Sequence, residues 1–132
     1  MSNISDILAG LQQAAANAYD GGEETGALKR EEGNPLLDYR VNDDFKVRFQ
    51  GDKIYITYSI ELPRKDYHER DFDLDLEQTF QDLSSYLKKE YKKVTGNSVQ
   101  LKKDGELDKD IEYVSIYKIL VTATCPYKIS GL

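Results

Sequence analysis

The stretch LEQTFQDLSSYLKKEYKKVTG, residues 76–96, has the strongest structural pattern in this chain of 132 residues. Apolar residues recur in it at intervals of three and four, which places them on one face of an α-helix of about five turns. These residues are Leu76, Phe80, Leu83, Leu87, Tyr91 and Val94. Asp75 with Gln78 resembles a capping box, and Gly96 is a typical C-terminal stop. We therefore predict an amphipathic helix that begins near Leu76.

Before this helix, two alternating segments predict a β-hairpin. In residues 45–50 and 53–62, apolar and polar side chains alternate with a period of two, as they do in half-buried strands. Gly51-Asp52 lies between the segments and suits a two-residue turn, because a type II′ turn needs glycine at its first position. Pro63 has no N–H to donate, so we expect the ladder to stop there.

After the helix, residues 98–102 predict a short strand and Asp104-Gly105 predicts a turn. Residues 111–129 are rich in Ile, Val, Thr and Tyr, and are long enough for one long strand or two shorter ones. Pro126 suggests a sheet edge or an exit from the sheet. The predicted fold class is α+β, with an antiparallel sheet of two hairpins (ββαββ) and the long helix packed across it.

The amino-terminal third predicts a helix followed by an extended arm, both outside a core domain of residues 45–132. Residues 1–20 show helical spacing, but the apolar stripe is thin and rich in alanine, so we expect this helix to find cover on another molecule. Residues 21–44 have no period and contain four glycines, as an arm or linker does. Its apolar residues are candidate contacts with a neighbouring subunit; the main ones are Leu28, Leu36, Leu37 and Tyr39.

Charge is unevenly distributed along the chain. The net charge is −6, which disfavours binding of nucleic acid or anionic membranes by the whole surface. Residues 86–103 nevertheless carry +5, which leaves −11 for the rest. Within them we define a basic patch of Lys88, Lys89, Lys92 and Lys93. The patch is compatible with a solvated helix end, with an acidic protein partner, or with a regulatory or nucleic-acid-binding module that uses Lys88–Lys103.

Patterns for catalysis, metals and cofactors are weak. Cys125 is the single cysteine, and its strand parity predicts a buried thiol in a protein of reducing, cytoplasmic origin. His68 lies among charged residues, which favours a solvated position. The alternating carboxylates of residues 71–75 fail as a calcium loop, because Leu76 stands where glycine is needed. We expect no catalytic, cofactor-binding or metal site, and keep an unrecognised carboxylate site in residues 66–75 as an alternative.

Three stretches resemble a known class of proteins: GALKREEGNPLLD at residues 26–38, RVND at residues 40–43, and YLKKEYKKVTG at residues 86–96. Together with the alanine-rich N-terminal helix, they resemble small virion structural proteins of contractile-tailed bacteriophages, particularly marine and cyanobacterial ones. The resemblance implies a non-enzymatic subunit in the neck, tail or baseplate of a virion, assembled in the host cytoplasm. Its expected partners are copies of itself or other virion proteins, with no membrane and no small-molecule substrate. Nucleic acid is not an expected partner.

Overall fold

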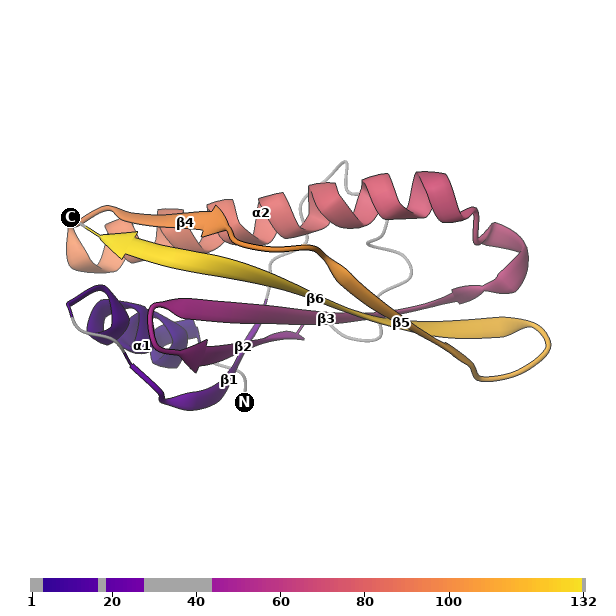
Figure 1. Ribbon diagram of the computed structural model, residues 1–132, viewed down its shortest axis with the longest axis horizontal. Helices are drawn as coiled ribbons and strands as arrows, with labels where there is room; N and C mark the ends of the chain where they lie inside the picture. Colours follow the sequence, from indigo (N-terminus) through magenta and orange to yellow (C-terminus); the bar gives the residue numbers. More distant parts are fainter. Residues whose placement is uncertain (1–3, 17–18, 28–43, 132) are drawn as a thin grey trace.

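The computed structural model describes residues 4–16, 19–27 and 44–131. Its elements follow in the order α1 (Ile4–Ala16), β1 (Gly22–Ala27), β2 (Asp44–Gln50), β3 (Lys53–Pro63), the 3-10 helix η2 (Arg64–Asp66), α2 (Glu69–Thr95), β4 (Val99–Lys103), β5 (Asp108–Tyr113) and β6 (Lys118–Gly131). The fold is α+β, with six described strands in one antiparallel sheet and two α-helices, and α2 runs along the length of the sheet (Figure 1).

The sheet has the order β1-β2-β3-β6-β4, and β5 also pairs with β6. The predicted hairpin of residues 45–62 is confirmed as β2 and β3, and β3 ends at Pro63. Gly51 between them has a φ of 66°, the positive value that a tight hairpin turn requires.

The predicted arrangement of two hairpins is not confirmed, because the second half pairs differently. Asp104-Gly105 does not reverse the chain: β4 and β5 follow one another along the same side of β6, which is 14 residues long and accommodates both. The reversal lies instead between β5 and β6. Pro126 is not at an edge either, because β6 is central and Tyr55 of β3 is its partner. The missing N–H of Pro126 costs the sheet no ladder hydrogen bond, because Pro126 faces the break between β4 and β5. The Pro126 oxygen still accepts a hydrogen bond from the Asp104 N–H at 3.0 Å.

Helix α2 begins at Glu69, earlier than the predicted start near Leu76. Phe72 explains the difference, because it is buried four residues before Leu76 and so continues the apolar stripe by one turn. The predicted end is confirmed: Gly96 is left-handed with a φ of 77°, and its N–H donates to the Lys92 oxygen. Val94 was predicted to belong to the stripe, but it is 66% exposed.

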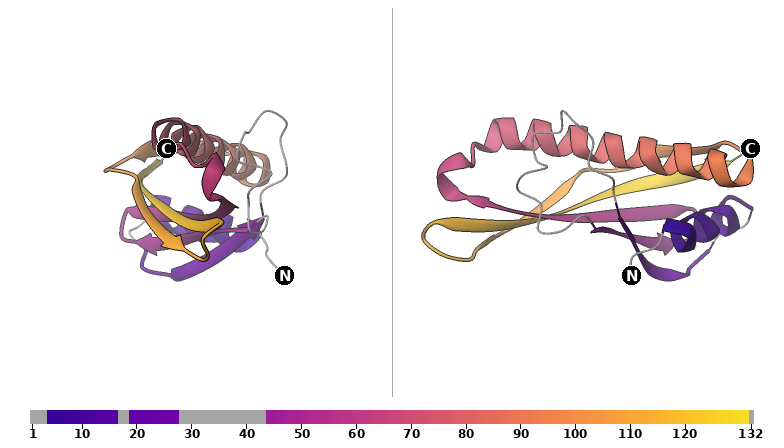
Figure 2. Two further views of the ribbon diagram at one scale, coloured as in Figure 1. Left: turned by 90° about the vertical axis from the view of Figure 1, so that its right-hand side faces the viewer. Right: turned by 180° about the vertical axis from the view of Figure 1, so that it is seen from behind.

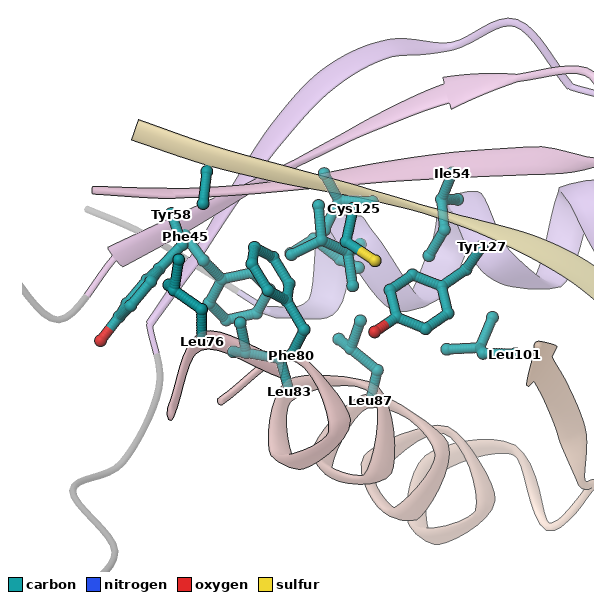
Figure 3. Packing of buried hydrophobic residues seen from close by; sticks show 14 of the residues in the cluster. Phe45, Ile54, Tyr58, Leu76, Phe80, Leu83, Leu87, Leu101, Cys125 and Tyr127 are labelled. Carbon is teal, nitrogen blue, oxygen red and sulfur yellow. The ribbon is translucent and has the colours of Figure 1, made fainter. Parts of the chain in front are cut away.

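The core lies between one face of the sheet and the two helices (Figure 3). Alternate residues of β2, β3 and β6 point into it, among them Ile56, Tyr58 and Cys125. From α2 it receives Leu76, Phe80, Leu83 and others. The strand parity predicted for Cys125 is confirmed, because the thiol is buried with its neighbours Ile119, Val121, Ala123 and Tyr127.

The amino-terminal segment packs on its own chain, contrary to the sequence-based expectation. In α1, Ile7, Leu8 and Leu11 are buried in the common core. This short apolar stripe is enough to hold α1 on the sheet, because Gly10 lets the helix approach Phe49 closely. A Cβ at Gly10 would lie 2.5 Å from the Phe49 ring. The expectation that this helix needs another molecule is therefore wrong for residues 4–16.

Residues 22–27 are not a free arm but the edge strand β1, paired with β2 along its whole length. The link from α1 is tied to the turn of the first hairpin, because the Tyr19 N–H donates to the Gly51 oxygen at 2.9 Å and Asp20 accepts from the Gly51 N–H at 2.7 Å. The predicted arm therefore begins in the sheet, and residues 28–43 lie outside the described residues.

Candidate interaction surfaces

Among the described residues, the most prominent exposed apolar surface is the end of the β5–β6 hairpin. Tyr113, Val114, Ile116 and Tyr117 are exposed to 65, 53, 71 and 74% respectively. With Ser115 they form a continuous segment, residues 113–117, which we call the hairpin tip. It lies at one end of the molecule, beyond the start of α2 (Figure 1; Figure 2, right).

Hydrogen bonds hold the hairpin tip in a defined conformation. The Ser115 hydroxyl oxygen accepts from the N–H groups of Tyr117 and Lys118, both at 3.1 Å. The Ser115 N–H donates to the Lys118 oxygen at 3.2 Å, which closes the turn. An exposed turn that is already ordered loses less conformational entropy when it binds a partner.

Arg64 connects the hairpin tip to the body of the protein. Its N–H donates to the Tyr117 oxygen at 2.8 Å, and its guanidinium donates to the Ile116 oxygen at 3.4 Å. The guanidinium also lies 4.9 Å from the centre of the Tyr113 ring, within the range of a cation–π contact. Tyr and Arg are enriched in the energetically dominant positions of protein interfaces.

A half-buried lysine, Lys109, fixes β5 against the first turns of α2. The Lys109 ammonium donates to Asp73 at 2.7 Å and to the Tyr67 hydroxyl at 3.0 Å. Burial acts to lower the pKa of Lys109, but the bonds to Asp73 and Tyr67 outweigh it, so the pKa lies above its ordinary value. Lys109 is therefore charged at neutral pH, and it holds the base of the hairpin in place.

The predicted basic patch does come together at the end of α2. Lys89, Lys92 and Lys93 are exposed and Lys88 is half-buried. Lys88, Lys89 and Lys92 border a shallow groove of about 290 Å³ together with residues 98–100. The patch therefore borders β4, which carries Lys102 and Lys103.

The predicted arm contacts lie outside the described residues. They are Leu28, Leu36, Leu37 and Tyr39.

A cavity of about 330 Å³ lies between α2 and the sheet, beside the break between β4 and β5. Its lining includes Phe80, Leu101, Cys125 and Tyr127 (Figure 3). Burial raises the pKa of the Cys125 thiol and of the Tyr127 phenol, so both are neutral at physiological pH. A thiol reacts as a nucleophile through its thiolate, so this environment does not activate Cys125.

The residues considered for a metal or histidine-dependent site lie at the start of α2. Residues 71–75 lie within α2, so the alternating carboxylates point in different directions around a helix. His68 is exposed at the N-terminus of that helix. Within residues 4–16, 19–27 and 44–131, no group of three or more His, Cys, Asp or Glu residues is arranged to hold a metal ion.

No known protein family, curated protein or solved structure matches this chain. None of the described helices combines the length and apolar character that a membrane span needs.

Proposed function

We propose that this protein is a non-enzymatic structural subunit of a multiprotein assembly, and that it contacts a neighbouring subunit through the hairpin tip. The single observation that carries the proposal is the exposure of four large apolar side chains on a turn that Arg64 and Ser115 hold in place. Scattered apolar residues are normal on protein surfaces, but a contiguous and ordered group marks an interaction site.

The partner of the hairpin tip is an apolar recess on another protein subunit. Four residues bury far less than the roughly 800 Å² per partner of a stable isolated interface, so the tip suits an assembly in which several contacts act together. The resemblance to small phage virion proteins supports a virion as that assembly, in the neck, tail or baseplate. On this proposal the protein is localised in the virion after assembly in the host cytoplasm.

The test combines the purified chain with each of the proteins encoded on either side of its gene and measures co-elution by size-exclusion chromatography with light scattering. The double variant Ile116→Ser/Tyr117→Ser is expected to lose a complex that the unchanged chain forms. Leu74→Ser/Val94→Ser is the matched control, because Leu74 and Val94 are exposed to 59 and 66% on α2. Equal co-elution of both double variants would contradict the proposal.

A second candidate function is a regulatory or nucleic-acid-binding module that uses the basic surface of Lys88–Lys103. Exposure of Lys89, Lys92 and Lys93 on one helix end favours it, and the net charge of −6 opposes it. Binding to a duplex DNA probe should then fall steeply between about 50 and 200 mM salt. Absence of binding at the lower salt concentration would remove this candidate.

A further inference from the structure

Among the described residues, the sheet ends in two edge strands of opposite charge. One edge is β1 (Gly22–Ala27), which pairs only with β2 among the described residues, and the other includes β4 (Val99–Lys103), which pairs with β6. Alternate N–H and C=O groups of an edge strand point away from the sheet and can pair with another strand. β1 carries Glu23 and Glu24, whereas β4 carries Lys102 and Lys103.

The two edge strands run in the same direction. Four antiparallel pairings lead from β1 to β4, so the chain direction is reversed an even number of times. A second copy placed beside the first without being turned over would therefore bring its β4 next to β1 as a parallel strand, with the helices of both copies on the same side of the sheet.

In one register of this pairing, both acidic residues lie beside basic ones on matching faces. Glu23 lies on the face away from the helices, where it is 3.7 Å from Lys46, and Lys102 shares that face with its cross-strand partner Lys128. Their neighbours lie on the helix face: Glu24 is the partner of buried Val47, and Lys103 is 4.0 Å from Glu77 of α2. A register that puts Glu23 beside Lys102 of the next copy also puts Glu24 beside Lys103.

Other edge pairings are disfavoured by charge. Two β1 strands would bring carboxylates together, and two β4 strands would bring ammonium groups together, which is destabilising for residues directly opposite one another. β5 lies on the same edge as β4 but carries Asp108, Asp110 and Glu112, so it would repel β1. Within the chain, Glu23 and Lys103 make ion pairs that are half-exposed or long, and such pairs contribute little to stability. These pairs therefore do not prevent Glu23 and Lys103 from pairing with the next copy.

We propose that copies of this chain associate head to tail, with β1 of one copy added as a parallel strand to β4 of the next. The contact is heterologous, so it generates a ring or an open filament according to whether the rotation between copies closes. This inference rests on the proposed role as an assembly subunit and names a second copy as one partner. It uses no residue of the hairpin tip, which extends along the strand direction beyond the sheet (Figure 1).

The test measures molar mass by light scattering after size-exclusion chromatography at about 50 mM salt, where surface charges are weakly screened. Three variants of the full chain are compared: Glu23→Lys/Glu24→Lys, Lys102→Glu/Lys103→Glu, and the control Lys89→Glu/Lys93→Glu. The control changes the net charge as much as the second variant does, but on α2. The unchanged chain and the control should form multimers. Each edge variant alone should associate at least about tenfold more weakly than the unchanged chain.

Mixing the two edge variants should restore association. The β1 strand of one variant, now basic, then faces the β4 strand of the other variant, now acidic. A variant that fails to fold cannot be rescued in this way. A monomeric unchanged chain, loss of association in the control, or no rescue on mixing would each overturn the proposal. Ile116→Ser/Tyr117→Ser should still self-associate while losing its other partner, so failure of the edge contact and failure of the hairpin tip give different results.

Discussion

The two tight hairpins that the structure describes end in opposite ways. The β2–β3 hairpin turns at Gly51-Asp52, and residues 19–20 bond to this turn, so its end belongs to the body of the protein. The β5–β6 hairpin turns through the apolar hairpin tip, which extends beyond the sheet. An exposed polar turn needs no further explanation. On our proposal, the exposed apolar turn that Arg64 holds in place is covered by a neighbouring subunit.

The largest expected effect comes from breaking the buried end of the first hairpin. Phe49→Ala should reduce the free energy of unfolding by about 3–5 kcal/mol, because Phe49 is buried against Gly10 and its ring lies 5.5 Å from that of Tyr19. Tyr113→Ala in the other hairpin should change it by about 0.5 kcal/mol or less, because Tyr113 is exposed. Urea unfolding measures both. A similar loss of unfolding free energy in both variants would contradict the view that the first hairpin ends in the core and the second in an exposed tip.

A smaller effect is expected at the first turn itself. Gly51→Ala should destabilise the protein by about 1–2 kcal/mol, because a φ of 66° brings a Cβ too close to the following carbonyl oxygen. Gly51→Asn is the matched control, since asparagine tolerates this conformation better than alanine. The melting temperatures should rank unchanged chain, Asn variant, Ala variant; an Ala variant as stable as the unchanged chain would show that the turn adapts.

Arg64→Met tests whether the second hairpin is held by Arg64. The change removes the guanidinium contacts to Ile116 and Tyr113, but it retains the backbone bond to Tyr117. Backbone amides of residues 113–118 should exchange faster with deuterium, while global stability falls by less than about 1 kcal/mol. Lys65→Met, at the exposed neighbouring position, should leave the exchange of the hairpin tip unchanged.

The smallest expected effect concerns Asp104, which follows β4. A hydrogen bond from Lys53 at 2.8 Å, together with the charge of Lys53, holds the pKa of Asp104 below its ordinary value. A lowered folded-state pKa stabilises the protein above the unfolded pKa of about 3.9, and this contribution is lost as the pH falls through the folded value. Titration of the Asp104 carboxyl followed by NMR should show the low pKa, and Lys53→Met should return it towards normal. An unchanged titration in that variant would rule out Lys53 as the cause.

The sequence predicted some of the candidate surfaces but missed the hairpin tip. The basic patch was predicted from four lysines on consecutive turns, and helical spacing alone brings such residues together. Residues 113–117 were instead included in a strand segment, because Tyr, Val and Ile favour strands. The sequence feature that could have revealed the hairpin tip is the loss of alternation there. No polar residue stands between Tyr113 and Val114 or between Ile116 and Tyr117. A period of two was needed for a strand with one exposed face.

By itself, the sequence determined the elements whose signals are local. The β2–β3 hairpin follows from alternation around Gly51, and α2 follows from its apolar spacing and its end at Gly96. Only the tertiary structure decided that α1 packs on its own sheet, that β4 and β5 share β6, and that the hairpin tip remains exposed. The physical reason is that period and turn chemistry specify which face of an element is apolar, whereas the surface that covers this face depends on contacts between residues far apart in the chain.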